Sequence, residues 1–379
     1  MKREWKNYFL QRFTKTVMIC TGIFFICLLT TQTVYAKTSS CQNVYLLRGD
    51  KKTISLGNNV NPQKYQWSTK NKRIASVNSK GKVTAVKKGS TIITAKRGKK
   101  QYQIKVYVKD EVDLIIFAGQ SNMSGGGNAA LAPTVIPGAG YEYRSVTAPK
   151  CLKNITEPFG KNENSGNLND SGYKRGSLVS SFVNAYYKKT KVPVVALSAT
   201  RIGSSTFFWK NSLCSETAKR YKKAAAYLKK RNVKIRHRYV VWLQGEAEGV
   251  YYVDGNTYIS NTKDIEQYFR KNCKTERFFV IRIGRYFGSE YPSKTEANLF
   301  DEIIRAQTKL ALDNSNFVLV SVKAASLPQS YYNEEGIHLN QTALNMIGKE
   351  AGENAAYYVK TKKQPKMYDG YLNTWIGSK

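Results

Sequence analysis

The chain has 379 residues, 41% of them hydrophobic and 23% charged, which is the composition of a globular protein long enough for two domains and a processed segment. Lysine and arginine number 61 against 26 aspartates and glutamates, so the net charge of +35 produces a field that attracts anionic polymers. Only two histidines are present, which excludes a histidine-rich zinc site, and neither a metal nor a cofactor is expected.

Residues 1–36 have the pattern of a secretory signal peptide. Five basic residues precede an apolar run at 17–29, and small residues follow up to Ala36. A retained anchor is the alternative, but the apolar run is short for a membrane span. We therefore expect a secreted or surface-associated protein that begins near Lys37. Export favours an anionic cell-wall polymer over nucleic acid as partner, unless the positive charge serves only solubility.

Four cysteines remain beyond the signal segment. They are widely spaced and form no CxxC pair, so one or two disulfides are allowed but no disulfide scaffold is predicted. These residues are Cys41, Cys151, Cys214 and Cys273.

Residues 39–109 alternate short apolar segments with turn residues, which predicts a small all-β sandwich. The segment also resembles the bacterial Ig-like group 2 domain, through Trp67 and Ser68, the alternating residues 74–77, the glycine-led strand 81–86 and the turn at 89–91. This resemblance implies a surface spacer or adhesion module without chemistry of its own. The module is rich in lysine and arginine, which favours attachment to a wall polymer.

In residues 110–358, apolar strands alternate with amphipathic helices. This alternation predicts a parallel sheet covered by helices on both faces, a three-layer α/β/α domain. Strands are expected at 114–118, 192–197, 239–243, 278–283 and 317–322, and helices at 178–188, 216–230, 265–272, 296–313 and from 341. Residues 124–175 are expected to form a long excursion over one rim, and residues 359–379 a basic tail.

Ser121 is the candidate nucleophile. The apolar strand within 112–118 ends at Gly119, and small residues follow the serine, so the serine is delivered to the edge of the sheet where ligands bind. A serine after a strand also caps helices, which is the competing interpretation. Other loops at the same edge decide between the two.

Those other loops supply the remaining groups for serine catalysis. His338 follows the last strand and has a carboxylate, Glu335, three residues before it, so one ring nitrogen can be oriented while the other faces the serine. Gly203 follows the second strand, where its N–H can donate to an oxyanion. Gln244 follows the third strand, and its amide can donate as well.

The domain resembles the SGNH-type carbohydrate esterases, in the branch of sialate O-acetylesterases and acetylxylan esterases. The resemblance rests on four segments in the family order, 119–123, 203–209, 242–246 and 336–340. It implies an SGNH-hydrolase-like sheet, with Ser121 as nucleophile and His338 as base. It also implies an oxyanion hole formed by the N–H groups of Ser121 and Gly203 and the amide of Gln244.

One residue departs from the family pattern. Aspartate usually stands three residues before the histidine, and this chain has Glu335, so either Glu335 or a backbone carbonyl orients His338. The side chains predicted to bind substrate are Gln120, Asn122, Glu246 and Trp209.

Together these observations predict a secreted serine esterase that removes O-acetyl groups from carbohydrate through an acyl-enzyme. Sialic acid, xylan and wall polysaccharide all remain possible carriers of the acetyl group. Aromatic residues in the rim loops can stack on sugar rings or lie in the core, and these are Phe207, Phe208, Trp209, Tyr251, Tyr252, Tyr331 and Tyr332. The alternative is a non-catalytic surface protein that binds glycan or wall polymer.

Overall fold

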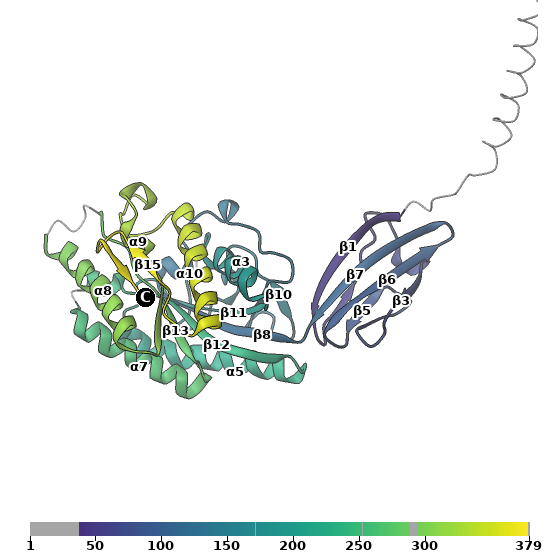
Figure 1. Cartoon of the computed structure of the whole chain (residues 1–379), viewed down its shortest axis with the longest axis horizontal. Helices are drawn as coiled ribbons and strands as arrows, with labels where there is room; N and C mark the ends of the chain where they lie inside the picture. Colours follow the sequence, from purple (N-terminus) through teal and green to yellow (C-terminus); the bar gives the residue numbers. More distant parts are fainter. Residues whose placement is uncertain (1–37, 171, 252, 289–293, 378–379) are drawn as a thin grey trace, which may run out of the picture.

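The computed structural model describes residues 38–170, 172–251, 253–288 and 294–377, which form a β module and an α/β domain that follow each other along the chain (Figure 1). The predicted signal peptide and its retained-anchor alternative lie outside the described residues. Within the described ranges, we find no helix with the length and apolar character needed to cross a membrane.

The module is a sandwich of two sheets, as predicted from its alternating sequence. The first sheet has the order β1-β7-β6-β3 and the second β2-β5-β4. The strands are β1 (Thr38–Leu47), β2 (Lys51–Thr53), β3 (Gln66–Thr69), β4 (Ala75–Val77), β5 (Lys82–Ala85), β6 (Gly89–Arg97) and β7 (Lys100–Lys109). Alternate side chains such as Ile93 and Ala95 of β6 point into the shared core, which is the period of two expected of a half-buried strand.

The α/β domain is built on a seven-stranded sheet in the order β10-β9-β11-β8-β12-β13-β14, parallel except for β10. The strands are β8 (Glu111–Gly119), β9 (Gly140–Tyr143), β10 (Leu152–Asn154), β11 (Val194–Thr200), β12 (Lys234–Leu243), β13 (Arg277–Ile281) and β14 (Phe317–Ser321). The five predicted strands are confirmed. β9 and β10 lie inside the segment predicted as an irregular excursion and extend one edge of the sheet.

Helices cover both faces of this sheet and form the predicted three layers. The long helices are α3 (Val179–Thr190), α5 (Cys214–Lys230), α7 (Gly255–Cys273), α8 (Lys294–Asp313) and α10 (Gln341–Thr361). On one face α3 packs against α10, and Gly348 and Gly352 allow the two backbones to approach closely. A Cβ on Gly348 would lie 2.4 Å from the Leu178 carbonyl oxygen, and a Cβ on Gly352 would lie 2.3 Å from the Phe182 carbonyl oxygen. On the other face α5 and α7 bury side chains such as Leu228 and Phe269.

Short helices occupy the loops. They are α2 (Ser121–Ser124), α4 (Thr206–Phe208), α6 (Glu246–Val250), α9 (Lys323–Ser326), the 3-10 turns η1 (Pro62–Lys64), η2 (Ala129–Leu131), η3 (Lys161–Glu163) and η5 (Gln329–Tyr331), and the π-helical η4 (Trp209–Leu213). Three of them, α2, α4 and α6, follow the carboxyl ends of adjacent strands β8, β11 and β12. These loops therefore meet at one edge of the sheet.

The C-terminal segment predicted as a basic tail is folded onto the domain. After α10 the chain forms the antiparallel hairpin of β15 (Met367–Asp369) and β16 (Thr374–Ile376). Met367 and Ile376 join the core, and Asp369 makes an ion pair with Arg282 in which both side chains are fully buried. The hairpin is thus an integral part of the α/β domain.

The cysteine side chains that the structure describes are free thiols. Cys151 is half-buried, and Cys214 and Cys273 are buried. Burial raises the pKa of the Cys273 thiol to about 12, so it stays protonated and packs as a small apolar group. The side chain of Cys41 lies outside the described residues, so the disulfide allowed for it stays a prediction.

Candidate active site

Ser121 lies at the carboxyl end of the central strand β8. The strand is buried from Val112 to Gly119, and Gly119 approaches β12 so closely that a Cβ would lie 1.9 Å from the Leu243 carbonyl oxygen. α2 begins at Ser121, so the N–H of Ser121 belongs to a first helical turn, which has no acceptor within its own helix. This N–H is available to an anion at the same edge that carries the serine hydroxyl.

Ser121, His338 and Glu335 form a continuous hydrogen-bonded chain. The Ser121 Oγ lies 3.0 Å from His338 Nε2, and His338 Nδ1 lies 2.5 Å from a carboxylate oxygen of Glu335. Gly336 between the two loop residues has a φ of +70°, a turn that allows the acid to fold back onto the ring. The glutamate therefore reaches the imidazole despite its extra methylene.

The Glu335 carboxylate is ionised at neutral pH. Its limited burial would raise the pKa, but hydrogen bonds from His338 and Asn333 and the positive charge of Arg175 hold the pKa below its usual value. The side chain is 58% exposed, so water screens its charge. The chief contribution of Glu335 is to fix the orientation of the imidazole ring. Because an ionised carboxylate only accepts hydrogen bonds, the proton of neutral His338 lies on Nδ1. His338 Nε2 is then free to take the proton of Ser121.

Asn122 holds the histidine loop in place. Its Oδ1 accepts from the Leu339 N–H at 2.9 Å, and its Nδ2 donates to the Ile337 carbonyl at 3.2 Å, so the residues on both sides of His338 are bonded to one side chain. Nδ2 also donates to Glu246 at 2.7 Å. The polar atoms of Asn122 thus bond to protein groups on both sides of His338, which indicates a role in positioning His338, and the predicted contact of Asn122 with substrate stays a prediction.

We expect Asn122→Ala to lower kcat about 10- to 100-fold with little change in KM, because the base loses its position while the substrate surface stays intact. Steady-state hydrolysis of a small acetate ester measures both constants. Asn184→Ala is the matched control, since Asn184 likewise bonds backbone groups of a loop, at residues 134 and 136. Equal losses in the two variants would contradict the positioning role.

The loop that carries Gly203 is anchored by Asp170. Its carboxylate accepts from Thr200 Oγ1 at 2.6 Å and from the Ile202 N–H at 2.7 Å, and the Ser124 hydroxyl of α2 donates to it as well. At the start of this loop, the Arg201 N–H donates to the carbonyl of Gly119 at 3.2 Å, and Gly119 stands two residues before Ser121. Asp170 thereby ties the Gly203 loop to the serine turn.

Gly203 itself is exposed and has a φ of +61°. Among the described residues, a Cβ there would find only the Tyr251 hydroxyl within 4 Å, at 3.8 Å. The predicted role of the Gly203 N–H is a contribution to the oxyanion hole. The role itself stays a prediction, because it concerns a bound state.

Gln244 is fully buried, and its amide donates to protein acceptors. Nε2 lies 3.1 Å from the Ser204 carbonyl and 3.3 Å from Gln120 Oε1, and it also donates to the Glu248 carboxylate. The predicted donation from Gln244 to an oxyanion would compete with these bonds, so it too stays a prediction. In this arrangement Glu248 sets the direction of the amide.

Gln120 and Trp209, which are also predicted to bind substrate, contact other residues of the loops at this edge of the sheet. Gln120 Oε1 accepts from the Gly245 and Ala247 N–H groups at 3.3 and 3.1 Å, which ties the serine turn to α6. Trp209 has no exposed surface, because it packs on Trp242, so the prediction that Trp209 contacts substrate is wrong. Its indole N–H instead donates to Ser204 Oγ at 3.1 Å beneath the Gly203 loop.

Glu246 is a buried carboxyl group that titrates near neutrality. Burial raises its pKa from 4.5 to about 7, although the Asn122 amide donates to it. The folded protein therefore binds one more proton than the unfolded chain between pH 4.5 and about 7, so this group lowers stability as pH rises through that window. Ionising it at this site costs about 3 kcal/mol.

We expect Glu246→Gln to reduce the pH dependence of stability, because the amide never ionises and still offers an oxygen to Asn122. Urea unfolding at pH 5 and at pH 8 gives the free energy of unfolding at each pH, and the decrease from pH 5 to pH 8 measures the pH dependence. The natural protein should lose about 2.5 kcal/mol more than the variant. Identical losses would mean that Glu246 titrates normally in the folded state.

Exposed aromatic and apolar side chains border the Gly203 loop. Phe207 is 69% exposed and Tyr251 59%, and Phe208 and Ile202 are also exposed. Tyr173, from the excursion over the rim, lies with its ring 5.3 Å from that of His338. Of the other predicted rim aromatics, Tyr332 is buried and Tyr331 half-buried, while Tyr252 lies outside the described residues.

Two acidic residues in this site, Asp170 and Glu248, have structural roles that sequence reasoning missed. Asp170 lies in an Asn- and Gly-rich segment whose path gives no periodic signal, and no sequence pattern distinguishes the role of Glu248 from that of Glu246 two residues before it. Lys174 Nζ lies 3.5 Å from Asp170 Oδ2, and burial lowers the pKa of the Lys174 ammonium group. Among the described residues, no cluster of three His, Cys, Asp or Glu side chains is arranged to hold a metal ion.

Comparisons with known proteins match both parts of the chain. The model of a carbohydrate esterase family, sialic acid-specific acetylesterase, matches residues 111–357, and that of the bacterial Ig-like domain (group 2) matches residues 49–107. No curated protein sequence matches the chain significantly.

Similar solved structures include proteins from a plant and from bacteria. A protein from Arabidopsis thaliana is 18% identical with a TM-score of 0.48, covering 67% of this chain and 99% of its own. A carbohydrate acetylesterase from Xanthomonas citri is 13% identical with a TM-score of 0.43, covering 87% and 78%. An acetylxylan esterase from Geobacillus stearothermophilus is 11% identical with a TM-score of 0.37, covering 64% and 94%.

Proposed function

The chain belongs to the carbohydrate esterase family of sialic acid-specific acetylesterases, and from this premise we propose that it hydrolyses O-acetyl esters through a covalent acyl-enzyme on Ser121. The observation that carries this proposal is the hydrogen-bonded chain from Ser121 through His338 to Glu335. A serine whose hydroxyl lies 3.0 Å from an oriented imidazole is arranged for nucleophilic attack.

In the first half of the reaction, Ser121 Oγ attacks the ester carbonyl carbon while its proton passes to His338 Nε2. The carbonyl oxygen becomes an oxyanion that accepts from the N–H groups of Ser121 and Gly203. When the bond to the sugar oxygen breaks, that oxygen takes the proton from His338. The products of this half are the deacetylated sugar and an acetyl group on Ser121.

In the second half, water attacks the acetyl carbon and gives its proton to His338 Nε2. A second oxyanion forms at the same place, and it collapses when Ser121 Oγ leaves and recovers the proton from His338. Acetate is released and the serine is regenerated. Glu335 accepts from Nδ1 throughout and stabilises the imidazolium that forms in each half.

Acetate release from a panel of O-acetylated glycans tests the proposal and identifies the acetyl carrier. The panel contains O-acetylated sialic acid, acetylated xylan and an O-acetylated wall polysaccharide, with the same polymers chemically deacetylated as controls. We expect acetate from at least one acetylated member and none from the controls. Binding of these glycans without any acetate release would favour the non-catalytic alternative.

We also propose that the protein is exported, because residues 1–36 carry basic, apolar and small-residue parts in the order of a secretory signal. Export would place an anionic cell-wall polymer within reach of a chain with a net charge of +35. Mass spectrometry of protein from the culture medium should find an N-terminus near Lys37. An intact N-terminus on cell-bound protein would favour the retained anchor.

A further inference from the structure

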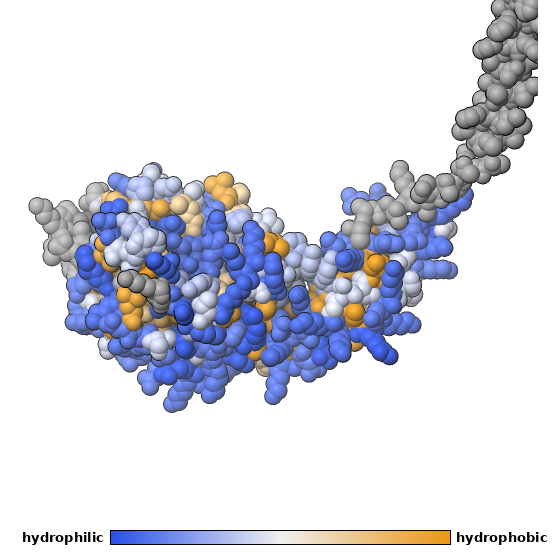
Figure 2. Space-filling model, viewed as in Figure 1, coloured by the Kyte–Doolittle hydropathy of each residue, from blue (hydrophilic) through white to orange (hydrophobic). Residues whose placement is uncertain are grey.

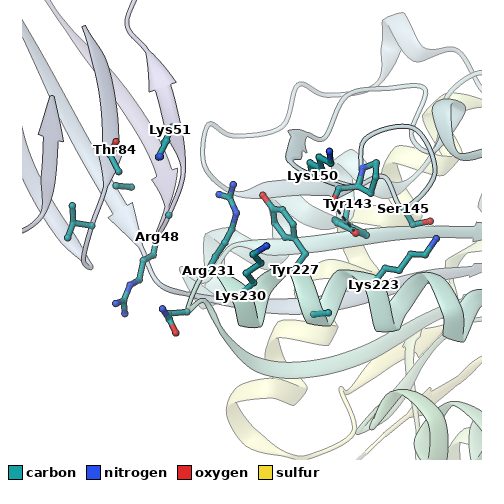
Figure 3. A pocket seen from close by; sticks show the side chains of 16 residues that line it. Arg48, Lys51, Thr84, Tyr143, Ser145, Lys150, Lys223, Tyr227, Lys230 and Arg231 are labelled. Carbon is teal, nitrogen blue, oxygen red and sulfur yellow. Dashed lines mark hydrogen bonds between the residues drawn. The ribbon is translucent and has the colours of Figure 1, made fainter. Parts of the chain in front are cut away.

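A cleft of about 1140 Å³ lies between the β module and the α/β domain, away from Ser121. Figure 3 shows its two walls. Arg48, in the turn after β1, and Lys51 of β2 belong to the module, whereas Lys223, Tyr227 and Lys230 lie along α5 and Arg231 directly follows that helix. Lys150, from the loop between β9 and β10, closes one side. The volume is sufficient for a segment of a polymer or a sizeable ligand.

The two parts of the chain meet at this cleft through specific contacts. Arg231 makes an ion pair with Asp50 of the module at 2.6 Å, and its guanidinium lies 4.7 Å from the centre of the Tyr227 ring. Leu47, at the end of β1, packs into the core of the α/β domain beside Val112. These contacts hold the walls at a fixed distance, so the cleft is a built feature of the fold.

The charge in the cleft is positive and mostly uncompensated. Of the residues that the structure describes, six basic ones and no acidic one line it: Arg48, Lys51, Lys150, Lys223, Lys230 and Arg231. Within the described part of the chain, only Arg231 of these six makes an ion pair. Five basic residues without an ion pair in the described part of the chain therefore border one concave space, where low-dielectric walls concentrate their field. The visible face of the molecule is mostly hydrophilic, with smaller hydrophobic patches on both parts (Figure 2).

We propose that this cleft binds a segment of an anionic glycan through carboxylate or phosphate groups carried by the polymer. Lysine and arginine side chains converging from two walls can contact successive anionic groups along one chain, with release of counterions. The binding is separate from catalysis, because the cleft shares no residue with the loops that carry Ser121, Gly203 and His338.

A glycan fits the cleft better than a single-stranded nucleic acid does. Nucleic-acid channels without sequence preference combine positive charge with exposed aromatic rings on which bases stack. Tyr143 in this cleft is only 3% exposed, and the half-buried Tyr227 ring contacts both the Arg231 guanidinium and the Tyr143 ring, so neither tyrosine offers an open stacking surface for a base. The cations thus act without a stacking platform, as expected for a polymer recognised by its charge.

The test compares two variants that remove the same charge from different places. The cleft variant carries Lys51→Gln, Lys223→Gln and Lys230→Gln. The control variant carries Lys96→Gln, Lys99→Gln and Lys100→Gln at the far end of the β6–β7 hairpin, about 30 Å along β7 from the junction. All six lysines are exposed, so neither variant removes a buried contact.

Binding is measured with full-length protein at several salt concentrations against four probes. These are polygalacturonate for carboxylate, poly(glycerol phosphate) for phosphate, dextran as the neutral glycan and single-stranded DNA. We expect one or both anionic glycans to bind, with about a tenfold or greater weakening and a shallower salt dependence in the cleft variant only. The two anionic probes distinguish carboxylate from phosphate recognition, and the absence of acetyl groups makes the result independent of Ser121.

Several outcomes would overturn the proposal. Equal weakening in the two variants would mean that the charge acts through the diffuse field of the whole protein. Equal binding of dextran, or preferential binding of DNA that is lost in the cleft variant, would assign the cleft to another ligand class. Val86→Glu provides a second check, because Val86 is 40% exposed in the cleft and a carboxylate there should repel the anionic glycan; unchanged binding would contradict the site.

Discussion

Ser121→Ala should lower kcat for acetate release by about 10³- to 10⁶-fold, the largest effect on activity that we expect from one substitution. The variant keeps His338, Glu335 and the N–H groups at the sheet edge, but it has no oxygen to form the acyl-enzyme. Any residual rate must come from water held near the oxyanion donors. KM should change little if it reflects substrate binding, since removing one hydroxyl leaves the rim unchanged.

Steady-state hydrolysis of a small acetate ester, followed together with the thermal unfolding of each protein, measures this effect. Ser330→Ala is the matched control, because Ser330 is an exposed serine in the rim loop before His338 and should have full activity. Undiminished turnover by a folded Ser121→Ala protein would remove Ser121 from the mechanism. A similar decrease of kcat in Ser330→Ala would show that the loss of activity comes from a disturbed loop and not from the missing nucleophile.

The largest effect on stability is expected from Asp369→Ala, which should lower the free energy of unfolding by about 3–5 kcal/mol. Asp369 and Arg282 are fully buried, and the guanidinium donates to Asp369 Oδ1 at 2.7 Å. The guanidinium also donates to Thr308 Oγ1 and the Val322 carbonyl, at 3.1 and 3.2 Å. Removing the carboxylate leaves an unpaired positive charge in the core and detaches the β15–β16 hairpin.

Urea unfolding at neutral pH measures this loss, and Asp313→Ala is its control. Asp313 pairs with Lys309 at 2.7 Å, but both side chains are more than half exposed, so the pair contributes at most about 1 kcal/mol. A similarly small loss for Asp369→Ala would mean that the C-terminal hairpin is not held by the buried pair. The comparison therefore separates a buried ion pair from an exposed one in the same domain.

The positions of the reacting groups were predictable because parallel topology fixes where loops meet. Ser121, Gly203 and His338 each follow a strand, and the carboxyl ends of parallel strands share one edge, so sequence order alone brings the three loops together. The contact between His338 and Glu335 was predictable as a short loop interaction, although only the structure shows that the glutamate reaches the ring.

The groups that hold these residues in place were much harder to predict. Asn122 bonds to residues more than two hundred positions away, and Asp170 bonds to a loop about thirty positions away, so no local pattern reveals either partner. β9 was missed because its four residues lie among glycine and proline and show no alternation. The C-terminal hairpin was missed because its charge suggested solvent, while Asp369 and two apolar residues are buried.

The short junction between β7 and β8 has a consequence for how the enzyme meets a polymer. β8 starts two residues after β7 ends and runs directly to the serine turn, so the module lies at the opposite edge of the sheet, about 30 Å from Ser121. A glycan held in the cleft would leave the catalytic edge uncovered. The two sites would then act as linked binding modules, in which retention at one raises the effective concentration of acetyl esters at the other without any change in intrinsic affinity.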